Sequence, residues 1–137
     1  NLDFSFSGLK TAVAVRLGQL GAAPTATQQA DMAASVQAAI VDVLCAKSLR
    51  ALQATGLQRL VVAGGVGANA SLRQRLDAQC RRIGARVHYP EPALCTDNGA
   101  MIALAAAMRW QAGLARPRTD GVFDVRPRWP LDEIETE

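Results

Sequence analysis

Residues 60–69 read Leu-Val-Val-Ala-Gly-Gly-Val-Gly-Ala-Asn, a short apolar run that ends in a glycine-rich turn. A run of this length with β-branched residues predicts a strand buried on both faces of a parallel sheet. Asn69 or Ser71 can cap a following helix, which the pattern extends to about Arg82. The glycines let a ligand approach the backbone, and the N–H groups of the helix start favour an anion. The turn lacks the Lys and Ser/Thr of a P-loop, so a tight turn without a ligand is an open alternative.

A second turn of this kind lies at residues 95–103, which read Cys-Thr-Asp-Asn-Gly-Ala-Met-Ile-Ala. Asp97 stands there at the mouth of the last helix, where its carboxylate can bind a divalent cation. Equally, Thr96 or Asp97 can simply cap that helix. One carboxylate does not make a metal site, and the single histidine, His88, is expected to be structural or solvent-facing. If Asp97 binds a metal, the other ligands therefore lie outside these 137 residues.

Periodicity and end signals predict the remaining elements. The alternation from Leu2 to Ser7 predicts a half-buried strand, and the spacing of Thr25 and Gln28 predicts a capping box. The expected elements are a strand at 2–7, helices at 9–20 and 25–55, a strand at 60–63, a helix at 69–82, a strand at 86–89 and a helix at 97–111. This order predicts an α/β fold with a mainly parallel sheet flanked by helices. Ligands of such sheets bind at the carboxyl ends of the strands, where both turns emerge.

The composition is that of a folded domain, with 137 residues of which 50% are hydrophobic and 20% charged. Three widely spaced cysteines without a CxxC pair indicate a reducing, cytoplasmic compartment, and Cys45 and Cys80 are interpreted as small core residues. No apolar run approaches the roughly 20 residues of a membrane span, so no membrane partner is expected. No signal peptide opens the chain, and it begins at Asn1 rather than Met, so we expect a piece of a longer protein.

Charge is unevenly spread around a net value of +3. One strand–helix–strand unit with a single acid, Asp77, carries the arginines Arg59, Arg73, Arg75, Arg81, Arg82 and Arg86. They predict a basic surface for phosphates or an RNA backbone, or else an ordinary solvated helix face. Near the start of the chain, Ser5, Ser7 and Lys10 flank Gly8. A lysine near a helix start opposes the helix dipole and so suits an anion, although it can equally be an ordinary surface lysine.

Three stretches together resemble one family. Residues 3–11 read Asp-Phe-Ser-Phe-Ser-Gly-Leu-Lys-Thr, and the turns at 62–69 and 95–103 follow in order. This set resembles the catalytic subunit of the tRNA adenosine threonylcarbamoyltransferase family, formerly called O-sialoglycoprotein endopeptidase. Residues 125–131 resemble the end of its bacterial members, so the resemblance covers nearly the whole chain. Gly67 is a mild departure, since many members carry Ser or Ala there.

The resemblance implies a partial lobe of the actin/hexokinase-like ATPase fold, which is ribonuclease H-like. It implies that residues 1–113 form most of the C-terminal lobe and that 114–137 form an irregular tail. The first strands of that lobe, the first lobe and its HxxxH metal pair would lie outside the chain. The implied activity transfers the threonylcarbamoyl group from threonylcarbamoyl-AMP to the exocyclic amine of the adenosine next to the anticodon in tRNAs reading ANN codons. The chain alone is expected to be inactive, and to self-associate through the exposed edge of its opening strand or else to be disordered near residues 1–7.

Site residues and partners also follow from the resemblance. Asp97 matches the family's metal-binding aspartate, which implies one divalent metal per subunit, iron or alternatively zinc. Asn69 matches a contact to the substrate nucleotide, and Gly64 and Gly65 match the loop that lets the nucleotide approach. Ser7 and Lys10 match a segment that lines the cleft, and no catalytic residue is assigned. The implied partners are tRNA, threonylcarbamoyl-AMP and accessory subunits that include an inactive paralogue and a small ATPase.

Two other functions are weighed against this one. A sugar or acetate kinase lobe shares the fold, but such kinases do not need the metal aspartate in the stretch 95–103. A non-catalytic scaffold paralogue is the second alternative, and the retention of Asp97 and Asn69 argues against it.

Overall fold

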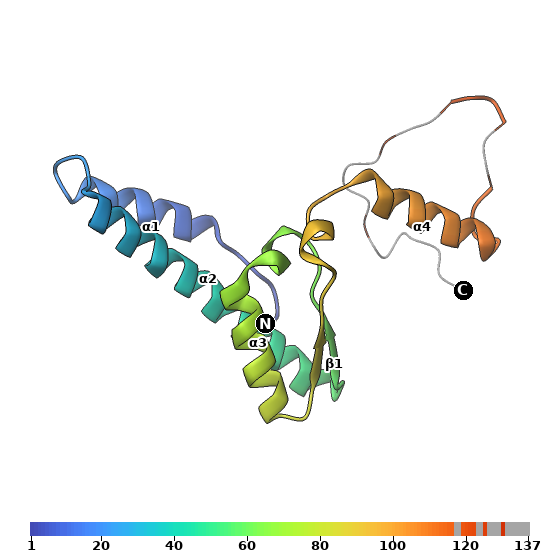
Figure 1. Ribbon diagram of the computed structural model, residues 1–137, viewed down its shortest axis with the longest axis horizontal. Helices are drawn as coiled ribbons and strands as arrows, with labels where there is room; N and C mark the ends of the chain where they lie inside the picture. The colour runs from blue at the N-terminus through green and yellow to red at the C-terminus, as the bar shows by residue number, and fades with distance from the viewer. Residues whose placement is uncertain (117–118, 123–124, 126–129, 131–137) are drawn as a thin grey trace. The chain divides into compact units, whose positions relative to one another are not determined.

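The computed structural model describes residues 1–116, 119–122, 125 and 130. They belong to two compact units, Asn1–Thr96 and Asp97–Glu137. In chain order the elements are α1 (Ser7–Gly18), α2 (Ala26–Thr55), β1 (Arg59–Val61), the 3₁₀ helix η1 (Gly65–Ala68), α3 (Ala70–Arg82), β2 (Arg86–His88), the 3₁₀ helix η2 (Pro92–Leu94) and α4 (Gly99–Gln111) (Figure 1). The predicted α/β class is thus confirmed. The tail predicted at 114–137 and the stretch 125–131 lie largely outside the described residues.

The helices α2 and α3 start where the capping residues in the sequence predict. At the start of α2, Thr25 Oγ1 accepts from the N–H of Gln28 at 3.3 Å, and Gln28 Oε1 accepts from the N–H of Thr25 at 2.9 Å. This is the predicted capping box, and α2 then runs to a left-handed Gly56. At α3, Asn69 Oδ1 accepts from the N–H of Leu72 at 3.0 Å, so Asn69 is the cap. Both helices are confirmed within a residue of their expected ends.

The sheet of the first unit consists of β1 and β2, which pair in parallel with Arg59 opposite Arg86. Leu60 of β1, Val87 of β2 and Val62, which directly follows β1, pack against a helical cluster formed by Val41, Cys45, Leu72 and Leu76. The opposite face is uncovered, because Val61 is 73% exposed. The prediction that the strand at 60–63 is buried on both faces is therefore wrong. Within the described residues, α2 and α3 contact a single face of the sheet.

The core of the first unit lies between α2, α3 and that sheet face. Leu76 is 1% exposed and Leu72 2% exposed, and burying a leucine completely contributes about 1.5–3 kcal/mol. Cys45, Cys80 and Cys95 are buried free thiols, which confirms Cys45 and Cys80 as small core residues. Burial raises the pKa of the Cys45 and Cys80 thiols, so both are held neutral.

The opening segment differs from its prediction. Residues 2–6 have no regular structure, and α1 already begins at Ser7. The alternating side chains do not enter a core, since Leu2 is 42% exposed and Phe4 50% exposed. A strand needs a partner for its backbone groups, and within the described residues the sheet contains β1 and β2 alone. Instead, Lys47 of α2 donates to the carbonyl of Asp3 and lies 5.6 Å from the centre of the Phe4 ring.

By length and composition α2 could cross a membrane, which corrects the expectation that no apolar run is long enough. In its most apolar stretch, 11% of the residues are buried. This is weak support for a membrane span, because core helices of soluble proteins meet the same criteria. Three residues of α2, Val41, Cys45 and Leu52, are buried in the first unit.

The second unit is built on α4. Its cap is Asn98, whose side chain accepts from the N–H of Met101 at 3.0 Å. The expectation that Thr96 or Asp97 caps this helix is therefore wrong: the helix starts at Gly99, and the residue directly before it has the required extended backbone. The large apolar side chains exposed on α4 are Met101, Ile102, Leu104, Met108 and Trp110.

Candidate functional site

The glycine-rich turn after β1 is built on one conformation that only glycine adopts readily. Gly64 has φ 85° and ψ 172°, a region that is essentially closed to other residues. Its carbonyl accepts from the N–H of Gly67 at 2.9 Å, which closes η1. A Cβ on Gly67 would lie 3.5 Å from Val62 Cγ1 and 3.9 Å from Cys95 Sγ, which are ordinary contacts. The turn therefore requires glycine at position 64 but would accept alanine at position 67.

Asn69 links this turn to α3 and to α2. Its Oδ1 caps α3, and its Nδ2 donates to Gln37 Oε1 of α2 at 3.2 Å. A carboxamide has two N–H donors and two lone pairs on oxygen, so one donor and one acceptor position remain for a ligand. Capping and ligand contact are thus compatible roles for this side chain.

A groove of about 830 Å³ opens beside the turn, within the range of small-molecule sites. It is lined by Val13 and Leu17 of α1, by Gln29, Met32, Ala33, Val36, Gln37, Ile40 and Val41 of α2, and by Gly65, Val66, Ala68 and Asn69 of the turn. Most of these side chains are apolar, and the carboxamides of Gln37 and Asn69 meet at one wall. Such a groove can hold a flat, apolar ring and hydrogen-bond its edge.

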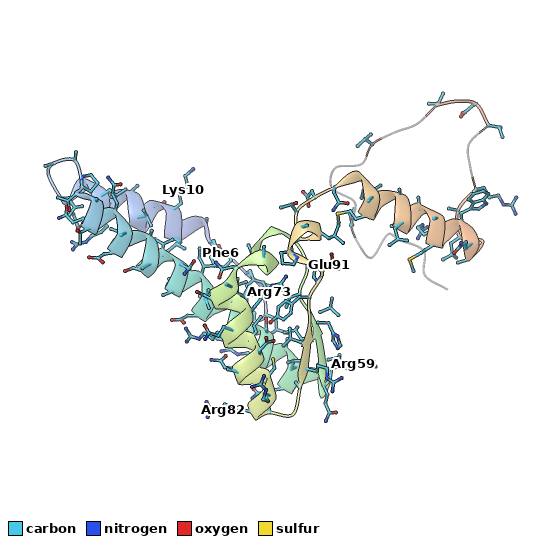
Figure 2. All side chains as sticks on the ribbon, viewed as in Figure 1. Phe6, Lys10, Arg59, Arg73, Arg82 and Glu91 are labelled. Carbon is cyan, nitrogen blue, oxygen red and sulfur yellow. The ribbon has the colours of Figure 1, made fainter. Side chains whose placement is uncertain are left out.

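Two predicted site residues are not brought to this groove. Ser7 is the first residue of α1, and its Oγ lies 3.1 Å from Ser5 Oγ on the surface. Lys10 is exposed, and Figure 2 shows it projecting from α1 on the side away from α2. The same helix contributes Val13 and Leu17 to the groove instead. The roles of Ser7 and Lys10 therefore stay predictions.

Asp97 is exposed, and because Asn98 caps α4, its carboxylate is not needed for capping. Among the described residues, no group of three or more His, Cys, Asp or Glu side chains could hold a metal ion. His88 is exposed in β2, as expected. The Asp97 carboxylate is thus placed to serve as one ligand of a metal, but the described part of the chain does not form a metal site by itself.

The arginines divide into separate groups. Arg59 and Arg86 are the first residues of β1 and β2, and Arg81 and Arg82 are the last residues of α3. All four are exposed, and they lie at the ends of these elements that are opposite the glycine-rich turn. Arg75 forms an ion pair with Asp42 of α2. Arg73 is partly buried and donates to backbone carbonyls, so it does not belong to an open basic surface. The basic surface is therefore smaller than predicted.

The family comparison adds the decisive observation. A family model for tRNA N6-adenosine threonylcarbamoyltransferase matches residues 1–104. The chain belongs to this family. The predicted resemblance is thereby confirmed, and a lobe of a sugar or acetate kinase is set aside.

Curated relatives named tRNA N6-adenosine threonylcarbamoyltransferase support the same assignment to the transferase family. The relatives from Methylibium petroleiphilum and Paracidovorax citrulli are each 66% identical over 134 residues, which is 98% of this chain and 38% of either relative. The relative from Verminephrobacter eiseniae is 66% identical over 131 residues, or 96% of this chain and 38% of its own length. The chain thus spans about 38% of the length of these relatives.

Proposed function

We propose that this chain is the nucleotide-binding part of an enzyme that transfers a threonylcarbamoyl group from threonylcarbamoyl-AMP to tRNA. The acceptor is the exocyclic amine of the adenosine next to the anticodon in tRNAs reading ANN codons. Family membership supports this reaction, and the groove at the glycine-rich turn is the observation that carries the chain's part in it. The finer fold we propose is a partial actin/hexokinase-like, ribonuclease H-like lobe, in line with a parallel sheet flanked by helices.

The adenylate half of the donor suits the groove. Its ring would lie against the apolar side chains of α1 and α2, and the phosphate would lie near the turn, where Gly64 and Gly65 keep the backbone open. The remaining donor and acceptor of Asn69 would contact the nucleotide. The chain's contribution to catalysis is thus to bind and orient the donor, which lowers the entropic part of the barrier.

Binding of AMP to the 137-residue chain tests this proposal. We expect isothermal titration calorimetry to detect AMP binding, and we expect Asn69→Asp, which keeps a capping oxygen but loses the amide donors, to weaken it several-fold. Ser35→Ala on α2 is the matched control, because Ser35 is exposed and is not among the groove residues. A chain with native helical content that binds no AMP would contradict the proposal.

We further propose that Asp97 supplies one ligand to a divalent metal, iron or alternatively zinc, whose remaining ligands lie outside residues 1–137. Its exposure, and the capping of α4 by Asn98 instead, support this role. A bound metal would stabilise negative charge on the adenylate leaving group. Metal analysis of the whole enzyme should show about one equivalent, which is lost in Asp97→Ala and retained in Asp31→Ala, because Asp31 is an exposed residue of α2 outside the proposed site. Metal retained in Asp97→Ala would refute this assignment.

The four exposed arginines Arg59, Arg81, Arg82 and Arg86 are proposed to contact tRNA phosphates. The 13-residue α3 places Arg81 and Arg82 about 20 Å from Asn69, a distance that an extended RNA can bridge. Replacing Arg81 and Arg82 by Ala should weaken tRNA binding by the whole enzyme and reduce its salt dependence, whereas Arg75→Ala should change neither as much because Arg75 is paired with Asp42. If both changes weaken tRNA binding equally, the proposal that Arg81 and Arg82 belong to a tRNA-binding surface is refuted.

The remaining partners follow from the same proposal. We propose accessory subunits that include an inactive paralogue and a small ATPase, and a cytoplasmic location, with which the free buried thiols agree. The opening segment forms no strand and so offers no edge, but the open edges of the described sheet of β1 and β2 support self-association of the chain alone. Sedimentation of the chain should show species larger than a monomer at high concentration. A whole enzyme with no metal and no affinity for adenylates would favour the non-catalytic scaffold.

A further inference from the structure

The Arg73 side chain lies between two segments that are far apart in the sequence. It projects from α3 one turn after Asn69, and its guanidinium reaches both the glycine-rich turn and the segment 90–95 that follows β2. Toward the turn, its Nε donates to the carbonyl of Gly67 at 2.6 Å. Toward the other segment, its Nη2 donates to the carbonyl of Pro90 at 2.9 Å and lies 3.3 Å from Cys95 Sγ.

Tyr89 fixes the guanidinium from one side. The carbon of the Arg73 guanidinium lies 4.6 Å from the centre of the Tyr89 ring, a cation–π distance. The Tyr89 hydroxyl donates to Asp77 Oδ1 at 3.1 Å and lies 3.2 Å from the carbonyl of Arg73 itself. The planar group is therefore held in one orientation, which is the property that distinguishes arginine from lysine at such a site.

Cys95 completes the connection. It is 2% exposed, and its Sγ lies 3.5 Å from the carbonyl of Glu91 as well as beside Arg73. A Cβ on Gly67 would be 3.9 Å from the same sulfur, so the turn and Cys95 are nearly in contact. The next residues in the chain are Thr96 and Asp97.

We propose that Arg73 is a positioning residue that ties the glycine-rich turn to the segment 90–95, so that a nucleotide bound at the turn also orders the segment that leads to Asp97. The ligand half of this proposal depends on the proposed nucleotide site. The structural half does not, because the contacts join two parts of the first unit without any ligand.

The test uses the reactivity of the three buried thiols in the 137-residue chain toward iodoacetamide, resolved by mass spectrometry of their peptides. In the wild-type chain all three should react slowly, because each is buried. In Arg73→Met, Cys95 should react about tenfold faster, because the local opening that exposes it becomes easier, while Cys45 and Cys80 keep their rates. Arg73→Lys should lie between these two, since lysine keeps the charge but not the fork of donors.

Arg75→Met is the matched control, because Arg75 lies two positions away on α3 and pairs with Asp42 rather than with the turn. It should leave the Cys95 rate unchanged. An unchanged Cys95 rate in Arg73→Met would overturn the proposal. An equal acceleration of all three thiols would also overturn it, since that result indicates only a general loss of stability. The lysine variant provides the same comparison if the methionine variant does not fold.

Added AMP separates this proposal from the nucleotide site. AMP should slow alkylation of Cys95 in the wild-type chain and have no such effect in Arg73→Met. If calorimetry detects no AMP binding at all, the nucleotide site is wrong, and the rates without AMP still decide the structural role of Arg73. If AMP binds and protects Cys95 equally in both chains, the nucleotide site stands and the positioning role of Arg73 is refuted.

Discussion

Replacing Asn69 by Ala tests how the glycine-rich turn is joined to α3. The change removes the cap on the N–H of Leu72, which contributes about 1 kcal/mol to stability. It also removes the hydrogen bond to Gln37, which contributes about 0.5 kcal/mol because the pair is largely exposed. We therefore expect the free energy of unfolding to fall by about 1.5 kcal/mol, and the melting temperature by about 5 °C for a chain of this size.

Urea unfolding followed by circular dichroism measures this change, with Asn69→Asp as the matched variant. Aspartate caps as well as asparagine and adds a favourable negative charge at the helix start, so it should restore most of the lost stability. A loss below about 0.5 kcal/mol in Asn69→Ala would refute the view that this cap determines the start of α3. A loss of equal size in Asn69→Asp would show that the Gln37 contact matters more than the cap.

Three further predictions concern the core, the turn and pH. Leu76→Ala should lower the free energy of unfolding by about 2–5 kcal/mol because the side chain is 1% exposed, whereas Leu57→Ala, at 62% exposed, should change it little in the same urea titration. Gly64→Ala should lower the free energy of unfolding by about 1–3 kcal/mol because of the backbone conformation of Gly64, whereas Gly67→Ala should change it little. Equal melting temperatures for the two variants would contradict this account of the turn. Burial, and then the hydrogen bond to Asp77, raise the pKa of Tyr89, so the native state keeps this proton longer than the unfolded chain does. The stability that this shift contributes is present below the ordinary tyrosine pKa of about 10 and is lost as pH rises above it. The melting temperature should therefore fall as the pH is raised above about 10, and it should fall less steeply in Tyr89→Phe.

The helices could be predicted well because their signals are local. The capping box of Thr25 and Gln28 and the cap Asn69 each act within four residues, so the sequence contains all that is needed to recognise them. The strand at 2–7 failed for the opposite reason. Its alternation is a real pattern, but a strand exists only if another strand pairs with it, and the described sheet offers none to this segment.

Only the local geometry of the candidate site could be predicted. The glycine-rich turn and the helix cap at Asn69 follow from the distinctive turn chemistry of residues 60–69, whereas the ligand contacts of Gly64, Gly65 and Asn69 stay predictions. The groove walls could not, since the helical spacing of residues such as Met32, Val36 and Ile40 looks the same for a core as for an open groove. Arg73 was interpreted as part of a basic surface, because nothing in its neighbourhood along the chain reveals contacts to Pro90 and Cys95.

The parallel pairing of β1 and β2 has a consequence for how the first unit folds. Parallel neighbours cannot be joined by a tight hairpin, so the whole of α3 must be accommodated before the two strands can meet. Closing that connection costs entropy, and the contact between α2 and α3 closes a loop of similar length, so we expect the sheet and the helical interface to assemble together. Refolding should then be slowed by changes at Leu72 or Leu76 in the helical interface, and also by changes at Val87, the β2 side chain that packs against it.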